Sequence, residues 1–283
     1  YYGNEEQKKK YLPRLAAGEI TGSFALTEPE AGSDAGSLRT TAKRDGDFYV
    51  INGSKRYITN APEADIFTLM ARTDLNSKDA RGVSAFIVER NTPGLTVGPY
   101  DRKMGQRGSH TADVIFDNVR VLATNIIGGQ EGMGFKTAMK VLDKARLNIA
   151  AVCVGAAERL LDEALNYARE RKQFGKPVAE FQLVQAMLAD SKAEVFAGRS
   201  MVLEAARKKD TGVNITMEAS CAKLFCAEMV GRVADRAVQI HGGAGYMQAS
   251  AVERLYRDVR LFRLYEGTSQ IQQLVIARHM LKD

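Results

Sequence analysis

The hydrophobic pattern of the chain changes character twice. Residues 1–20 form a short helical stretch that is closed by Gly18. From about residue 21 to 125, short apolar runs separated by turn residues predict strands at 23–28, 38–43, 48–51, 55–59, 66–72, 83–88 and 114–116. Turns are predicted at Asp45-Gly46 and again at Asn52-Gly53, because both dipeptides favour tight hairpin turns. Many short strands at this spacing indicate an all-β barrel or sandwich.

From about residue 133 the apolar positions recur at helical spacing. The pattern predicts three long helices at 133–171, 178–209 and 216–240, and shorter helices at 251–262 and 268–282. The breaks between the long helices fall at Gly175 to Pro177 and at Gly212. Long antiparallel helices with short connections form bundles. The chain is therefore predicted to be a multi-domain α+β protein, with a β-domain followed by a helical bundle.

Composition and charge narrow the function classes. The 283 residues are 45% hydrophobic and 26% charged, as in soluble globular proteins, and no apolar run reaches the roughly 20 residues of a membrane helix. The net charge of +6 suits a polyanionic ligand, although a mildly basic surface explains it as well. The lysines lie in short mixed-sign segments, which disfavours nucleic acid.

Cysteine and histidine usage argues against a disulfide framework and against a metal site. The chain has three cysteines, an odd number, with no CxxC pair, and its three histidines are far apart. A reducing compartment fits this pattern, either a bacterial cytoplasm or a mitochondrial matrix.

Two segments of the predicted β-region carry candidate ligand-binding groups. The run from Leu26 to Asp34 reads LTEPEAGSD, and its hydroxyls and turn N–H groups can hold a polar ring edge or a pyrophosphate. Further along, strand alternation places Tyr57 and Thr59 on one face, where an aromatic ring and a hydroxyl can contact a planar cofactor. An ordinary strand-to-loop transition and a solvated strand face remain alternatives.

The predicted helical region carries further polar groups, each with a structural alternative. Asp143 and Arg146 share one helix face, and a surface ion pair explains them. The cations from Arg169 to Lys172 are favourable at a helix C-terminus without any ligand. The glycine-rich run at 242–245 fits a phosphate loop or a helix C-cap.

The segment YEGTSQIQ at 265–272 contains the strongest candidate for a general base. Glu266 precedes Gly267 at the start of a helix that Thr268 or Ser269 is able to cap. A carboxylate aimed from a tight turn into a cavity acquires a raised pKa, as a base acting near neutral pH requires. A capping or surface glutamate is the alternative.

Several segments, in order and at family spacing, resemble the acyl-CoA dehydrogenases. Residues 24–34 are similar to the first signature of that family, and residues 239–246, 257–258 and 265–272 are similar to the second. The run RKQFGK at 171–176 matches the segment between them, and the similarity extends over essentially all 283 residues.

The resemblance implies an N-terminal helical domain, a middle β-domain and a C-terminal four-helix bundle. On this basis residues 1–20 are the end of the helical domain, most of which lies outside this sequence. Residues 21–127 are the middle β-domain, and residues 128–283 are the bundle. The resemblance also implies a homotetramer, built as a dimer of dimers, with FAD held between subunits, and a role in fatty-acid β-oxidation.

The resemblance assigns site residues by position. Those matching FAD contacts are Phe24, Leu26, Thr27, Ser33, Tyr57, Thr59, Arg171, Gln173, Phe174, Gln239, Gly243, Thr268 and Gln270. Arg171, Gln173, Phe174, Gln239 and Gly243 match positions that reach the FAD of the neighbouring subunit. Many members have Trp where this chain has Tyr57, a change that keeps an aromatic ring. Those matching substrate positions are Ser33, Asp143, Arg146, Tyr265, Gly267 and Arg278.

The reaction implied by the resemblance is α,β-dehydrogenation of an acyl-CoA thioester to a trans-2-enoyl-CoA. Some relatives place the base at the position of Ala145, which is unable to act as one, so the implied catalytic base is Glu266. A hydride passes from the β-carbon to flavin N5, and electrons then pass to an electron-transfer flavoprotein. Acyl chain length and branching are not fixed by the sequence.

Two other functions stay open at this point. An acyl-CoA oxidase or flavin monooxygenase on the same fold passes electrons to oxygen. A non-catalytic acyl-CoA-binding fragment is the alternative from a different class, although the presence of Glu266 and of nearly all flavin motifs argues against it.

Overall fold

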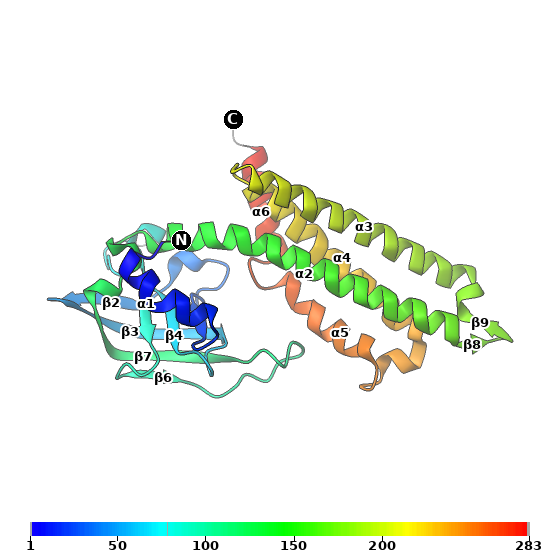
Figure 1. Ribbon diagram of the computed structural model, residues 1–283, viewed down its shortest axis with the longest axis horizontal. Helices are drawn as coiled ribbons and strands as arrows, with labels where there is room; N and C mark the ends of the chain where they lie inside the picture. The colour runs from blue at the N-terminus through cyan, green and yellow to red at the C-terminus, as the bar shows by residue number, and fades with distance from the viewer. Residues whose placement is uncertain (1, 78, 282–283) are drawn as a thin grey trace. The chain divides into compact units, whose positions relative to one another are not determined.

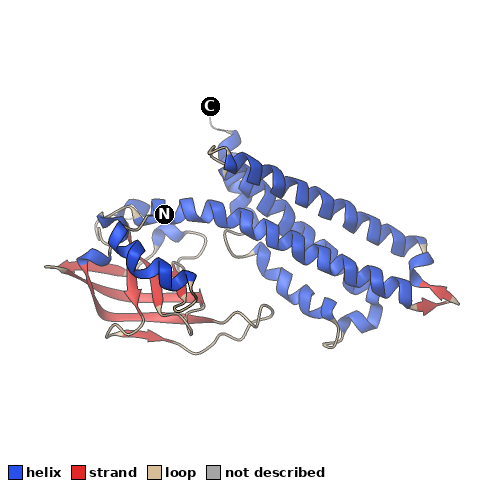
Figure 2. Ribbon diagram, viewed as in Figure 1, coloured by secondary structure: helices blue, strands red, loops and turns tan. Residues whose placement is uncertain are grey.

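The computed structural model describes residues 2–77 and 79–281. Tyr1, where the first predicted helical stretch begins, and Lys282, where the last predicted helix ends, lie outside these ranges. The chain forms two compact units, one of Tyr1–Lys103 with Arg107–Lys140 and one of Met104–Gln106 with Val141–Asp283. Strands dominate the first unit and helices the second (Figure 2). Each unit is described by itself.

The first unit is built on one curled sheet. Its strands are β1 (Gly22–Ala25), β2 (Thr41–Asp45), β3 (Phe48–Thr59), β4 (Ile66–Arg72), β5 (Val83–Glu89), β6 (Leu95–Val97) and β7 (Thr111–Leu122). The strand order is β1-β4-β2-β3-β7-β6, and β5 pairs with β4. Most pairs are antiparallel, but β1 and β2 both run parallel to β4. The predicted hairpin at Asp45-Gly46 is confirmed, because it joins β2 to β3.

The predicted turn at Asn52-Gly53 is wrong. These residues lie inside β3, which continues to Thr59 and carries a bulge opposite β7 between Ile51 and Gly53. Gly53 has φ of 148°, and a Cβ at this position would lie 2.5 Å from Oγ1 of Thr40. The glycine therefore serves a close approach between neighbouring backbones instead of a reversal of the chain.

Helix α1 (Glu5–Ala16) covers one part of the sheet. Asn4 caps it with a reciprocal capping box, in which the Gln7 N–H donates to the Asn4 side chain at 2.8 Å. Tyr11 packs with Ile66 and Ile87 of the sheet. The predicted helical stretch at the start of the chain is thus confirmed, and it belongs to the first compact unit.

The second unit is helical. It contains α2 (Gly134–Glu170, of which the first turns belong to the first unit), α3 (Gln182–Asp210), α4 (Thr216–His241), α5 (Ala251–Val259) and α6 (Ser269–Met280). Helices α2, α3 and α4 run alongside one another (Figure 1), and small residues such as Ala157, Ala222 and Ala227 form much of their shared core. The predicted helical bundle is confirmed.

Two short features end the long helices. A small hairpin, β8 (Lys172–Gln173) with β9 (Lys176–Pro177), joins α2 to α3 where the sequence predicted only a break. Helix α4 ends at His241, and Gly242 follows with φ of 57°, so the glycine-rich run begins as a helix C-cap. Among the described residues, no helix combines the length and the apolar character needed to cross a membrane.

Candidate active site

Glu266 stands on a turn with an uncommon backbone conformation. The turn links the short helix Arg260–Arg263 to α6, and it has φ of 56° at Glu266 and 86° at Gly267. Thr268 caps α6, since its Oγ1 accepts a hydrogen bond from the Ile271 N–H at 3.2 Å. A left-handed conformation is costly for a residue with a side chain, and it is retained where surrounding contacts hold it.

Oε2 of Glu266 is buried and lacks a hydrogen-bond partner among the described residues, while the residue as a whole is half-buried. Burial raises the pKa of Glu266, while the positive charges of Arg146 and Lys223 oppose the rise without cancelling it. The alternative of a capping glutamate is wrong, because Thr268 supplies the cap of α6. The buried Oε2 also distinguishes Glu266 from a fully solvated surface glutamate. A buried carboxyl oxygen without a partner and a raised pKa are features that functional sites often contain.

Two residues that sequence reasoning missed hold this turn. The ammonium group of Lys223 on α4 donates to the carbonyl of Gly267 at 2.7 Å. The side-chain amide of Gln272 on α6 donates to the carbonyls of Glu266 and Gly267 at 3.1 and 3.0 Å. Both side chains are fully buried. A signal was present for Lys223, since it lies on the apolar face of α4 that also carries Ala219, Cys226 and Val230.

The predicted pair of Asp143 and Arg146 lies on α2 and is an ion pair of 2.7 Å. Arg146 is buried, so the alternative of a surface pair does not describe it. Asp143 also accepts from the hydroxyl of Thr216 at 2.9 Å, which ties α2 to the start of α4. The buried Nε of Arg146 lacks a hydrogen-bond partner among the described residues and is available to a ligand.

Three other predicted residues of the second unit lie within twelve positions of Glu266 in the sequence. Tyr265 is partly buried, and burial raises its pKa to about 12, so the phenol is neutral at physiological pH. Gln270 and Arg278 lie on α6 with exposed side chains.

A second group of predicted residues gathers at the opposite end of α2. Arg171, Gln173 and Phe174 lie on or beside the β8–β9 hairpin with exposed side chains, and Phe174 is 93% exposed. The ring of Tyr167 on α2 stacks on that of His241 at 4.2 Å between centroids, which brings the end of α4 to this place. Gln239 and Gly243, both exposed, flank His241 in the sequence.

The two groups of the helical unit are far apart. From Arg146 to Glu170, α2 is about 36 Å long, at about 1.5 Å per residue, and Figure 1 shows it as one continuous helix. Arg146 belongs to the Glu266 group and Glu170 adjoins the hairpin, so the structure does not bring these two sets of predicted residues together in one chain.

In the first unit, hydrogen bonds connect the two segments that were predicted to contact the flavin, one around residues 23–34 and one at residues 55–59. The hydroxyl of Ser23 on β1 donates to the carbonyl of Thr59, and the Arg56 N–H donates to the carbonyl of Thr27 at 2.8 Å. Tyr57 and Thr59 are both exposed while Ile58 between them is buried. Regular strand alternation does not produce this exposure, because β3 is irregular between Lys55 and Ile58 and Tyr57 has φ of 58°.

The remaining predicted residues of this unit lie in or next to these two segments and differ in exposure. Phe24 is exposed, Leu26 is buried and Thr27 is partly buried, while Ser33 is exposed on the loop that follows. Tyr57 leaves 59% of its side chain exposed, an uncommon amount for an aromatic residue. Exposed aromatic rings with adjacent hydroxyls fit the expected flavin, which has a planar ring with a polar edge.

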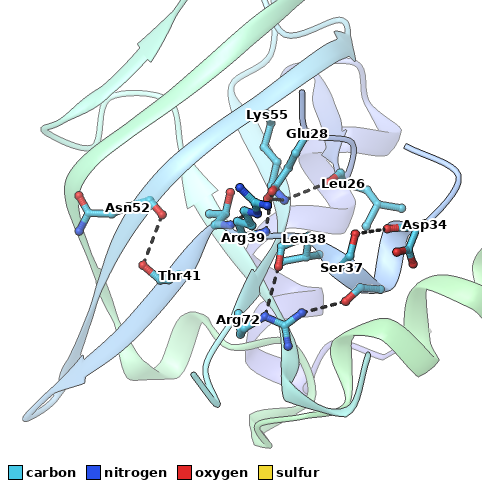
Figure 3. A network of polar contacts seen from close by, with 12 residues as sticks. Leu26, Glu28, Asp34, Ser37, Leu38, Arg39, Thr41, Asn52, Lys55 and Arg72 are labelled. Atoms are coloured by element: carbon cyan, nitrogen blue, oxygen red, sulfur yellow. Dashed lines mark hydrogen bonds and ion pairs between the residues drawn. The ribbon is translucent and has the colours of Figure 1, made fainter. Parts of the chain in front are cut away.

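A buried network of polar contacts connects the LTEPEAGSD loop to β3 (Figure 3). Glu28 accepts hydrogen bonds from Lys55 at 2.7 Å and from the N–H groups of Arg39 and Thr40 at 2.6 and 2.9 Å. Lys55 also donates to the carbonyl of Leu26 at 3.0 Å.

Arg72 holds the segment that directly follows this loop. Its guanidinium group donates to the carbonyls of Gly36 and Leu38 at 2.8 and 3.2 Å. The sequence analysis did not identify Glu28, Lys55 or Arg72 as functional. A lysine and an arginine inside apolar strands were the available signal.

Comparison with known proteins identifies the family. Residues 23–119 match the model of the acyl-CoA dehydrogenase middle domain, and residues 132–281 match that of the acyl-CoA dehydrogenase C-terminal domain. The chain is 51% identical over 283 residues to the probable acyl-CoA dehydrogenase YngJ of Bacillus subtilis, an alignment covering 100% of this chain and 74% of the relative.

Two further relatives extend the comparison. The 3-(aryl)acrylate reductase of Clostridium sporogenes is 46% identical over 280 residues, covering 99% of this chain and 74% of the relative. The butyryl-CoA dehydrogenase structure from Megasphaera elsdenii superimposes with a TM-score of 0.96 at 42% identity, covering 99% and 73% of the two chains. On both family models and these relatives, the chain belongs to the acyl-CoA dehydrogenase family, whose enzymes are flavoprotein oxidoreductases.

Proposed function

We propose that this protein dehydrogenates an acyl-CoA thioester to the trans-2-enoyl-CoA, with Glu266 as the base and FAD as the cofactor. The observation that carries the proposal is the buried Oε2 of Glu266, which lacks a partner within the described chain. An ionisable group in this state has its pKa shifted towards the working range of a general base.

Glu266 removes the proton from the α-carbon of the substrate in this mechanism. Arg146 and Lys223 place positive charge near the carboxyl group and oppose the rise in its pKa that burial causes. The peptide N–H of Glu266 donates to the thioester carbonyl, where negative charge develops as the proton leaves. FAD supplies the acceptor for the hydride that leaves the β-carbon.

The remaining predicted residues are proposed as binding contacts. Ser33, Asp143, Arg146, Tyr265, Gly267 and Arg278 are assigned to the acyl-CoA. Phe24, Leu26, Thr27, Ser33, Tyr57, Thr59, Thr268 and Gln270 are assigned to FAD.

We assign the hairpin group to the FAD of a neighbouring subunit. Arg171, Gln173, Phe174, Gln239 and Gly243 lie about 36 Å along α2 from the Glu266 group. A cofactor contacted by Glu266 in one chain therefore meets the hairpin of another chain, as in the expected homotetramer. Reduced flavin then passes its electrons to an electron-transfer flavoprotein.

The first experiment is an anaerobic titration of the purified holoenzyme with butyryl-, isobutyryl-, octanoyl- and palmitoyl-CoA. Loss of flavin absorbance near about 450 nm with one of them supports the dehydrogenation and identifies the substrate class. Bound flavin that none of the thioesters reduces would contradict the proposal. A protein that binds these thioesters but no flavin would favour the non-catalytic alternative.

A variant comparison tests the base. Glu266→Gln should keep its flavin and lose about 10³-fold in the rate of flavin reduction, because only the proton acceptor is removed. The control is Glu163→Gln, which removes a carboxylate from an ion pair with Arg159 on the surface of α2. Equal rates in the two variants would rule out Glu266 as the base.

The similarity to the 3-(aryl)acrylate reductase suggests a second candidate function, in which the same site reduces an enoyl-CoA. The name of this relative describes the reduction of an acrylate, which is the reverse of dehydrogenation. Chemically reduced holoenzyme mixed with the enoyl-CoA product should recover its flavin absorbance if the site runs in both directions. Oxygen consumption during turnover distinguishes the oxidase alternative.

A further inference from the structure

Lys223 is held deep inside the helical unit by a contact that involves no carboxylate. Its side chain has 0% exposure, and its recorded hydrogen bond is the one to the Gly267 carbonyl at 2.7 Å. Burying an ammonium group is costly unless its position is required or its charge is compensated. The position of Lys223 therefore needs an explanation beyond packing.

The contacts of Lys223 and Gln272 converge on one short piece of backbone. Together they donate to the carbonyls of Glu266 and Gly267, the two consecutive residues with left-handed φ. Gly267 has no room for a side chain, because a Cβ there would lie 2.6 Å from Nε2 of Gln272. These contacts fix the direction in which the Glu266 side chain and its peptide N–H point.

A second set of contacts anchors the same turn from its flanks. The hydroxyl of Ser269 donates to Glu228 on α4 at 2.7 Å, and Arg263 forms an ion pair with the same carboxylate at 3.0 Å. Glu228 is therefore neutralised by its own partners. Lys223 interacts electrostatically with Glu266 and also with Glu228.

We propose that Lys223 is a positioning residue for the reaction, which orients the Glu266 turn through the Gly267 carbonyl and places its positive charge beside that turn. Gln272 contacts the same turn but carries no charge, so it contributes to orientation alone. This inference rests on the proposed function, because it assigns a role to Lys223 in the proton removal by Glu266.

The charged and titratable groups around this site are few. Glu266 faces Arg146 of α2, Lys223 of α4 and the neighbouring phenol of Tyr265. Lys223 in turn faces Cys153 and Arg146 of α2, and Glu228 and Glu266. Burial raises the pKa of the Cys153 thiol, so it stays neutral. Burial lowers the pKa of Lys223 to about 8, so the ammonium group is charged below that pH.

The test is the pH dependence of the flavin-reduction rate in holoenzyme variants, measured anaerobically with the acyl-CoA that the titration identifies. Lys223→Gln removes the charge but keeps a donor, and Gln272→Met removes a donor but no charge. In Lys223→Gln, the acidic limb of the rate profile should move to higher pH by about one unit, because a nearby positive charge is lost. In Gln272→Met the rate should fall at every pH while the acidic limb stays in place.

Lys223→Arg provides the rescue, since it keeps a positive charge and should return the acidic limb towards that of the wild type. Where Lys223→Gln does not retain flavin, Lys223→Met carries the same comparison with Gln272→Met. An unmoved acidic limb in Lys223→Gln, or equal shifts in Lys223→Gln and Gln272→Met, would overturn the role of the charge. Failure of the proposed function is a separate result, because the wild-type flavin would then not be reduced at all.

Discussion

Nζ of Lys55 lies 2.7 Å from Oε1 of Glu28, and both side chains are buried in the first unit. The pair joins β3 to the LTEPEAGSD loop, whose residues Thr27 and Ser33 are assigned to the flavin. Burial alone would raise the pKa of Glu28, but the charge and hydrogen bond of Lys55 with the N–H donors hold it below its ordinary value.

Lys55→Met should destabilise the first unit by about 3–5 kcal/mol, because it leaves a buried carboxylate without its counter-charge. Urea unfolding measures the loss, with Lys43→Met as the control at an exposed position of β2. Because the folded pKa of Glu28 is depressed, the difference between wild type and variant should shrink as the pH falls through that pKa. The double variant Lys55→Met/Glu28→Gln should recover part of the loss. A single variant as stable as the control would contradict this account.

Gly53→Ala should destabilise the first unit by about 2–3 kcal/mol, because the methyl group would collide with Thr40 in a backbone region that L-residues avoid. Gly46→Ala is the matched control, since it also has positive φ, 58°, but open space around the added atom. Its cost should be only about 1 kcal/mol. Thermal or urea unfolding of both variants makes the comparison, and equal losses would show that strain at Gly53 is conformational alone.

Glu266→Gln should unfold at a higher temperature than the wild type at pH 8, although we expect it to have lost almost all activity. Burial raises the pKa of Glu266 in the folded state, so the stability contributed by its protonated form is lost as the pH rises through that pKa. Glutamine does not titrate, and the advantage of the variant should grow from pH 5 to pH 8, to roughly a few degrees. Melting curves of the apoprotein across this range measure it. A constant difference would mean that the pKa of Glu266 is the same in the folded and unfolded states.

Phe174→Ser should leave the stability of the subunit unchanged and weaken the retention of FAD. The ring is 93% exposed within its own chain, so its removal takes little apolar contact from the fold. If it contacts the cofactor of a neighbouring chain, gel filtration should yield protein with less flavin per subunit. Leu75→Ser, at an exposed position of the first unit, is the control and should keep its flavin.

The order of elements was predictable from the sequence because each signal was local. Apolar runs bounded by turn residues gave the strands, and apolar positions at helical spacing gave the helices from Gly134 to Met280. Asn52-Gly53 was misread because the same dipeptide fits a turn and a bulge. Only the partner strand distinguishes them, and the approach of Thr40 to Gly53 is a contact that local patterns do not contain.

The residues that support the candidate site were harder to predict from the sequence. Glu266 stood out because a glycine and a helix start follow it directly in the sequence. Lys223 lies more than 40 positions before it, and its contact with Gly267 exists only after α4 and α6 have packed. Burial of Lys55 likewise depends on which strand faces the Glu28 loop. Long-range contacts of this kind have no signature in sequence spacing.

The length of α2 has a genetic consequence. Suppose one chain carries a defective base and another a defective hairpin; neither can build a working site with copies of itself. If each site takes its base from one chain and its hairpin from another, as proposed, a mixed assembly combines the intact base of one chain with the intact hairpin of the other in one complete site. Two inactivating alleles in the same gene should therefore complement each other, as they would not in an enzyme whose sites each belong to a single chain.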